Sequence, residues 1–155
     1  MVKIEKVENK DRVILEKMLQ LYLHDISLYF TIEFDDKTGI YKYDDLDKYF
    51  TNESNYAYFI RYEGNIVGFV LIDIINKQNI IQEMFVLNNY KSKGIGKDAV
   101  INIFNQYRGN WIIRSLPNSS KAENFWNKTI KEYTNNKFEV EHVGKYNRAV
   151  FTFYN

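Results

Sequence analysis

A glycine-bearing loop between an apolar segment and a predicted helix has the residue types and spacing that anion binding requires. After the apolar run 80–87, the chain reads Lys91-Ser92-Lys93-Gly94-Ile95-Gly96-Lys97. Gly94 and Gly96 have no β-carbon, so a ligand can lie against the main chain, and the free N–H groups of a following helix attract negative charge. The lysines add full positive charges. We therefore predict a pyrophosphate-binding loop.

Two other phosphate-binding motifs fit the loop poorly. The nucleotide P-loop has the pattern GxxxxGK[ST], whereas Gly94 and Gly96 are two residues apart and Asp98 occupies the place of the hydroxyl residue. The dinucleotide fingerprint GxGxxG/A matches Gly94, Gly96 and Ala99, but it should follow its strand directly, and a polar stretch separates it from Leu87. A tight turn without a ligand is the remaining alternative, and the lysines argue against it.

The loop instead fits the pattern [Q/R]xxGxG/A, with Lys91 in the leading basic place. On these residues the chain resembles the GNAT superfamily of acyl-CoA-dependent N-acetyltransferases. A second signature of that family, NxxAxxFY, corresponds to Ser119-Ser-Lys-Ala122-Glu-Asn-Phe125-Trp126, with serine in place of asparagine and tryptophan in place of tyrosine. The stretch 22–29, together with Leu116-Pro117 and Phe125-Trp126, also looks like an uncharacterised bacterial branch of predicted acetyltransferases.

The resemblance implies that acetyl-CoA is the cofactor and that CoA is released as a product. The main chain of Met84, Phe85 and Val86 would pair with the pantetheine arm, whose amides can satisfy backbone groups at a parted strand edge. Residues 91–97 would hold the pyrophosphate. Further cofactor contacts are expected from Asn118, Ser119, Phe125 and Lys128.

The reaction implied by the resemblance is direct transfer of an acetyl group to a primary amine. Deprotonating a lysine-like amine at pH 7 costs about 4.6 kcal/mol, so a base is expected. Glu83 is the expected catalytic residue, although strand alternation leaves open whether Glu83 or Gln82 faces the cleft. Trp126 is a poor substitute for the family's tyrosine, which returns a proton to the leaving thiolate, because an indole N–H is not a practical acid.

The acceptor itself is not specified by the sequence beyond a small-molecule or peptide amine. By resemblance, Tyr22, Asp25 and Tyr29 would line the acceptor cleft. The acidic segment 33–36 could attract a cationic amine, although acidic loops are usually solvated. A second hypothesis also stays open: an acyl-CoA-binding sensor or partner-binding module of the same fold, with little or no catalysis.

The hydrophobic pattern predicts the elements that would position these residues, in an α/β (α+β) order. Helices are expected at 13–29, near 44–50, at 95–107 and after Pro117, with a loop at 31–45. Strands are expected at 2–7, 56–62, 66–74, 80–87, 111–116, 138–143 and 148–154. The resemblance implies a twisted, mostly antiparallel sheet of about seven strands with helices on both faces, in which strands 80–87 and 111–116 are parallel and splayed.

Composition limits the other functions. The 155 residues fit one domain, 1–155, and 21 Lys+Arg against 20 Asp+Glu give no field that favours nucleic acid or an anionic membrane. The chain has no cysteine, so a thiol nucleophile is excluded. His24 and His142 lack partners at metal-binding spacing, and we expect no metal. We expect a cytoplasmic protein, and a homodimer is compatible with the sequence.

Overall fold

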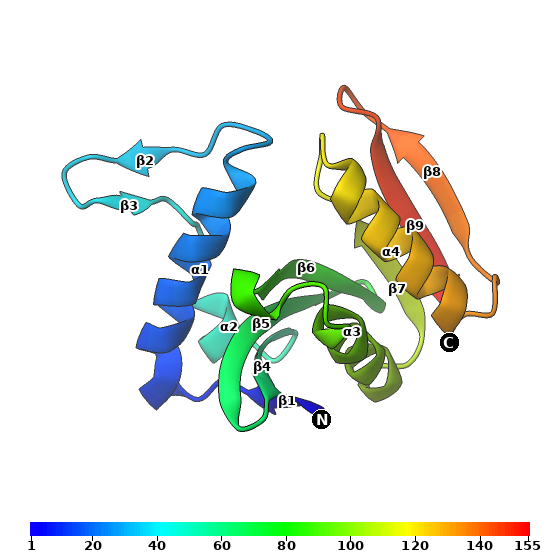
Figure 1. Ribbon diagram of the computed structural model, residues 1–155, viewed down its shortest axis with the longest axis horizontal. Coiled ribbons are helices and arrows are strands. Elements are labelled where there is room, and N and C mark those ends of the chain that lie inside the picture. The colour runs from blue at the N-terminus through cyan, green and yellow to red at the C-terminus, as the bar shows by residue number, and fades with distance from the viewer.

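The computed structural model describes all residues from Met1 to Asn155, and its centre is a seven-stranded sheet in the order β1-β4-β5-β6-β7-β9-β8 (Figure 1). Neighbouring strands are antiparallel except β6 and β7, which are parallel. This confirms the predicted mixed, mostly antiparallel sheet. The strands are β1 (Val2–Lys6), β4 (Asn55–Tyr62), β5 (Asn65–Ile75), β6 (Gln78–Val86), β7 (Asn110–Arg114), β8 (Glu139–Val143) and β9 (Arg148–Tyr154).

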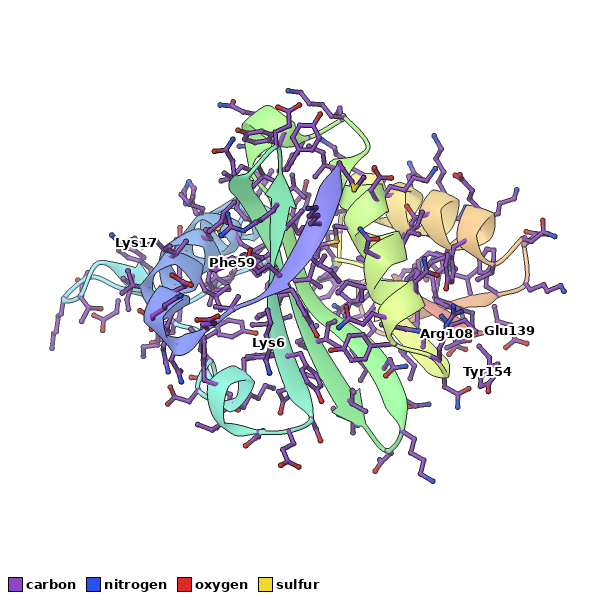
Figure 2. The ribbon with its side chains drawn as sticks, turned by 90° about the horizontal axis from the view of Figure 1, so that it is seen from below. Lys6, Lys17, Phe59, Arg108, Glu139 and Tyr154 are labelled. Atoms are coloured by element: carbon purple, nitrogen blue, oxygen red, sulfur yellow. The ribbon has the colours of Figure 1, made fainter.

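Helices cover both faces of the sheet, as predicted. The helices α1 (Arg12–Ile26) and α2 (Lys48–Thr51) contribute to one core, and α3 (Ile95–Gln106) and α4 (Ser120–Tyr133) to the other. Figure 2 shows α1 and α3 on opposite sides of β1. Short 3-10 turns, η1 (Asn9–Asp11) and η2 (Asn88–Tyr90), precede α1 and α3. No helix combines the length and the apolar character needed to cross a bilayer.

The helices α1 and α3 each pack against the sheet through one apolar face. In α1, the buried residues recur at three- and four-residue steps, which gives a continuous stripe toward the sheet; they are Leu15, Met18, Leu19, Leu23 and Ile26. In α3 the same spacing buries Ile95, Ala99, Val100, Ile103 and Phe104. Burying one such large side chain stabilises the fold by roughly 1.5–3 kcal/mol. These stripes hold both helices close to β6.

The segment 31–45 differs from its prediction as a loop. It contains a small hairpin, β2 (Phe34–Asp35) and β3 (Ile40–Tyr41), beyond the end of α1. Gln20 fixes the hairpin to α1, because its side chain donates to the Tyr41 carbonyl at 2.9 Å and accepts from the Tyr41 N–H at 2.8 Å. Strands this short show no readable alternation, which is why the pattern missed them.

The sheet opens between β6 and β7. These strands pair only from Gln78↔Asn110 to Ile80↔Ile112, so the edge of β6 that faces β7 is unpaired from Ile81 onward. Figure 1 shows β7, β9 and β8 turning away from β6. The predicted splay of the parallel pair is thereby confirmed.

Candidate functional site

The N-terminus of α3 carries a row of unpartnered backbone N–H groups. Gly94 precedes the helix in the left-handed conformation, with φ +79°, and no side chain caps this end. None of the N–H groups from Ser92 to Lys97 donates to a backbone carbonyl. The start of α4 is different, because the Ser119 hydroxyl accepts from the Ala122 N–H at 3.1 Å. The start of α3 is therefore open to an anion.

The lysines of this loop are arranged unequally. Lys97 donates to the Glu132 carboxylate of α4 at 2.6 Å, and Lys91 lies 3.7 Å from the carboxylate of Asp25. Lys93 has no acidic partner and lies over the Tyr90 ring, 5.5 Å from its centroid. Ion pairs this exposed contribute about 0–1 kcal/mol, so an incoming phosphate can compete for these side chains.

The phosphate loop, β6 and α4 meet at Gly96. A β-carbon built there would lie 3.4 Å from the Met84 methyl carbon and 3.6 Å from the Phe125 ring. Phe85 and Val86 continue the strand as buried residues. The structure therefore brings the predicted pantetheine strand, the loop and Phe125 together in one place.

The remaining predicted cofactor residues lie on or near α4. Asn118 donates from its side-chain amide to the Tyr29 carbonyl at 3.1 Å, which joins the start of α4 to the end of α1. Ser119 is the helix cap, and Lys128 is exposed without an ion-pair partner. Trp126 is buried in the core, with its ring centroid 5.1 Å from that of Phe125.

The Glu83 carboxylate faces α1. It accepts a hydrogen bond from the Tyr22 hydroxyl and a longer one, 3.4 Å, from the Tyr43 hydroxyl. Gln82 is exposed and is the extra residue of a β-bulge, because Leu71 pairs with Glu83 while the next residue of β5 pairs with Ile81. Of these two neighbours, Glu83 is therefore the one that points toward α1.

Burial raises the pKa of Glu83 above its usual value, and this effect exceeds the opposing hydrogen bonds from Tyr22 and Tyr43. Burial also raises the pKa of both tyrosines, and the nearby Glu83 charge raises them further. Both hydroxyls therefore stay protonated at neutral pH. Glu83 is the member of this cluster that can exchange a proton under ordinary conditions.

A buried carboxylate, Asp73, lies on β5, the strand next to β6. Asp73 of β5 accepts from Tyr49 at 2.7 Å and from Asn55 at 2.9 Å, and Lys48 lies 3.3 Å away. Tyr43 and Tyr49 influence each other's pKa, so their hydroxyls are neighbours. This network fixes the segment that brings Tyr43 to Glu83.

Among the residues expected to line the acceptor cleft, Tyr22 is the one that contacts Glu83. Asp25 faces Lys91, and Tyr29 is half-buried beyond the end of α1. Two residues near Glu83 were not predicted from the sequence: Tyr43, which no periodicity marks, and Arg148, whose charge lowers the pKa of Glu83. Arg148 alternates with the buried Ala149 and could have been assigned to the opposite face of its strand.

Comparison with known proteins gives one family match. A sequence model described as the acetyltransferase (GNAT) family matches residues 18–130. No curated protein matches the sequence.

Solved structures share the fold at low sequence identity. An acetyltransferase from Thermus thermophilus aligns over 100% of this chain and 97% of its own, with a TM-score of 0.76 and 12% identity. A spermidine N-acetyltransferase from Vibrio cholerae, in complex with CoA and spermine, aligns over 99% and 95%, with a TM-score of 0.65 and 12% identity. The PaiA N-acetyltransferase from Thermoplasma acidophilum, in complex with CoA, aligns over 100% and 99%, with a TM-score of 0.65 and 11% identity.

Proposed function

The chain belongs to the acetyltransferase (GNAT) family, and on that premise we propose that it transfers an acetyl group from acetyl-CoA to a primary amine, with Glu83 as the catalytic base. The observation that carries the proposal is the location of Glu83. It is a half-buried carboxylate of raised pKa on the strand whose open edge adjoins the uncapped start of α3. The proposed base therefore lies on the strand that packs beside the anion-binding start of α3.

The residues present fit acetyl-CoA. The N–H groups from Ser92 to Lys97 and the Lys93 ammonium suit a pyrophosphate. The unpaired edge of β6, over Met84, Phe85 and Val86, offers backbone groups to an amide-bearing arm. When bound, acetyl-CoA supplies an activated thioester.

The proposed transfer is direct, and the chain has no cysteine that could carry the acetyl group as a thioester. The amine nitrogen forms a bond to the acetyl carbon, and the thioester C–S bond breaks. Glu83 takes the amine proton, directly or through a water molecule, and a proton from solvent neutralises the leaving thiolate. Tyr22 and Tyr43 hold the carboxylate in position.

Trp126 favours a second candidate, an acyl-CoA-binding sensor or partner-binding module of the same fold. Its ring is buried in the core, and its indole cannot replace the family's tyrosine as an acid. A thiol of ordinary pKa near 8.5 leaves without much help, so this loss is compatible with turnover.

The test is the release of free CoA thiol from acetyl-CoA across a panel of amines. We expect turnover with at least one amine and a loss of about 100-fold or more in Glu83→Gln, the range that general bases contribute. The matched control is Gln82→Ala, which changes the exposed neighbour and should keep its activity. Tight CoA binding without turnover on any amine would favour the sensor.

A further inference from the structure

Two arginines lie on the face of the sheet that carries Glu83. In β7, Trp111 and Ile113 belong to the core beneath α3, so Arg114 points to the opposite face. Its cross-strand partner is Val150, and Arg148 lies two residues away on the same face of β9. Glu83 shares this face because it lies two residues from Phe85, which packs in the core beneath α1.

Arg148 is anchored at one atom and free at its others. Its Nε donates to the Ser115 carbonyl at 2.5 Å, while the Ser115 N–H donates to Ala149 at 3.0 Å. Its two terminal nitrogens form no hydrogen bond. Arg114 is exposed, and neither arginine forms a salt bridge with a carboxylate. The Arg148 guanidinium is therefore held through its Nε, and its two terminal nitrogens are available as hydrogen-bond donors.

Charge effects link Arg148 both to Arg114 and to Glu83. Burial lowers the pKa of Arg148, and the positive charge of Arg114 lowers it further, whereas Glu83 and Tyr22 raise it. Two guanidinium groups that repel each other without a bridging carboxylate are stabilised by a bound oxyanion. A planar guanidinium binds carboxylate or phosphate through two parallel hydrogen bonds.

We propose that Arg114 and Arg148 bind an anionic oxygen group, a carboxylate or a phosphate, that the amine acceptor carries beside its reactive nitrogen. This inference rests on the proposed function and narrows it to acceptors such as amino acids, peptides with a free carboxylate or phosphorylated amino alcohols. The same charges oppose polycations. The chain would therefore differ in its acceptor from the neighbour that was solved with spermine.

The experiment compares acceptors in matched pairs, using acetyl-CoA and wild-type protein. Each amino acid is paired with its carboxamide, which has the same size without the charge, and O-phosphoethanolamine is paired with ethanolamine. The variants are Arg148→Gln and Arg114→Gln. The control is Arg108→Gln, which changes an exposed arginine that precedes β7 at its other end (Figure 2).

We expect the anionic member of at least one pair to have a kcat/KM tenfold or more above its neutral partner. Arg148→Gln and Arg114→Gln should remove that preference, and Arg108→Gln should keep it. A preference within the amino acid and carboxamide pairs indicates a carboxylate, and a preference for O-phosphoethanolamine over ethanolamine indicates a phosphate. Both arginine variants should bind CoA as the wild type does.

Several results would overturn the inference while leaving acetyl transfer intact. These are equal or better use of the neutral partners, a preference that survives in both arginine variants, and a loss of CoA affinity in those variants. The assay is repeated with succinyl-CoA, and an arginine-dependent preference for this acidic donor would assign the pair to the acyl group instead. If CoA binds and no amine is acetylated, the proposed function itself fails.

Discussion

The Glu83 carboxylate is held by tyrosine hydroxyls from two separate segments, Tyr22 on α1 and Tyr43 after β3. Burial alone would raise the pKa of Glu83 further, and these donors, together with the Arg148 charge, restrain the rise. Asp73 acts in the opposite direction. The pKa of Glu83, the proposed base, therefore reflects a balance in which burial and Asp73 raise it and the two hydroxyls lower it.

Replacing Tyr22 by phenylalanine removes a donor to the ionised carboxylate. Because that hydrogen bond lowers the pKa of Glu83, its loss should raise the pKa, and the acid limb of kcat/KM should move to higher pH by about one unit. Tyr43→Phe should shift the limb less, because its hydrogen bond is longer. A pH profile with one amine measures both, and a shift to lower pH in either variant would contradict the assignment.

At the scale of elements, the candidate site lies where three segments end or separate: the start of α3, the open edge of β6 and the first residues of β9.

Gly94 and Gly64 offer a matched comparison. Both have a positive φ, +79° and +83°, and a β-carbon would meet nothing within 4 Å at either position. Gly64 lies in the turn between β4 and β5, far along the chain from the phosphate loop.

Gly94→Ala and Gly64→Ala should each lower the free energy of unfolding by about 1–2 kcal/mol, the cost of the left-handed conformation. Only Gly94→Ala should also weaken CoA binding, because it disturbs the N–H groups at the start of α3. Chemical unfolding and CoA titration of the two variants check this. Equal CoA affinity in both would place the pyrophosphate elsewhere.

Gly68 lies on β5, which pairs with β6 on the side opposite the open edge of β6. A β-carbon there would overlap the carbonyl oxygen of Phe85, so Gly68→Ala must force β5 and β6 apart. We expect a loss of about 2–3 kcal/mol in unfolding free energy, larger than for Gly64→Ala. Denaturant unfolding measures the difference. A neutral substitution would show that the two strands approach less closely than the structure indicates.

Elements with long apolar patterns were predictable from the sequence, and the details that place side chains were not. The helix expected at 95–107 spans Ile95–Gln106, because its stripe of buried residues repeats over three turns. The direction of Glu83 depends on the register between β5 and β6, and a bulge at Gln82 cannot be read from one strand. The partners of Glu83 come from segments distant in sequence.

At the scale of the whole molecule, the two cores lie on opposite faces of the sheet and extend along it to different strands. The core beneath α3 and α4 has 20 buried residues and extends across the sheet to β9, while the core beneath α1 and α2 has 12 and ends at β6. The face of β7 and β9 on the α1 side therefore lies outside the smaller core. This leaves Glu83 at the boundary between a packed and an open region of one face.

CoA should stabilise the whole fold if it binds across this boundary. At a concentration 100 times its Kd, a ligand adds about 2.7 kcal/mol to the free energy of unfolding, which for a chain of this size raises Tm by about 5–11 °C. A thermal-shift series with CoA, ATP and NAD measures this. A rise with ATP or NAD and none with CoA would contradict the assignment of the loop.

The pH dependence of acetyl transfer by wild type and Glu83→Gln, measured with one accepted amine, tests the central claim most directly. The wild type should show an acid limb in kcat/KM with an apparent pKa above the ordinary glutamate value, because burial raises that of Glu83. In Glu83→Gln the rate should fall about 100-fold or more, and this limb should disappear. A variant that keeps both the rate and the limb would show that Glu83 is not the base.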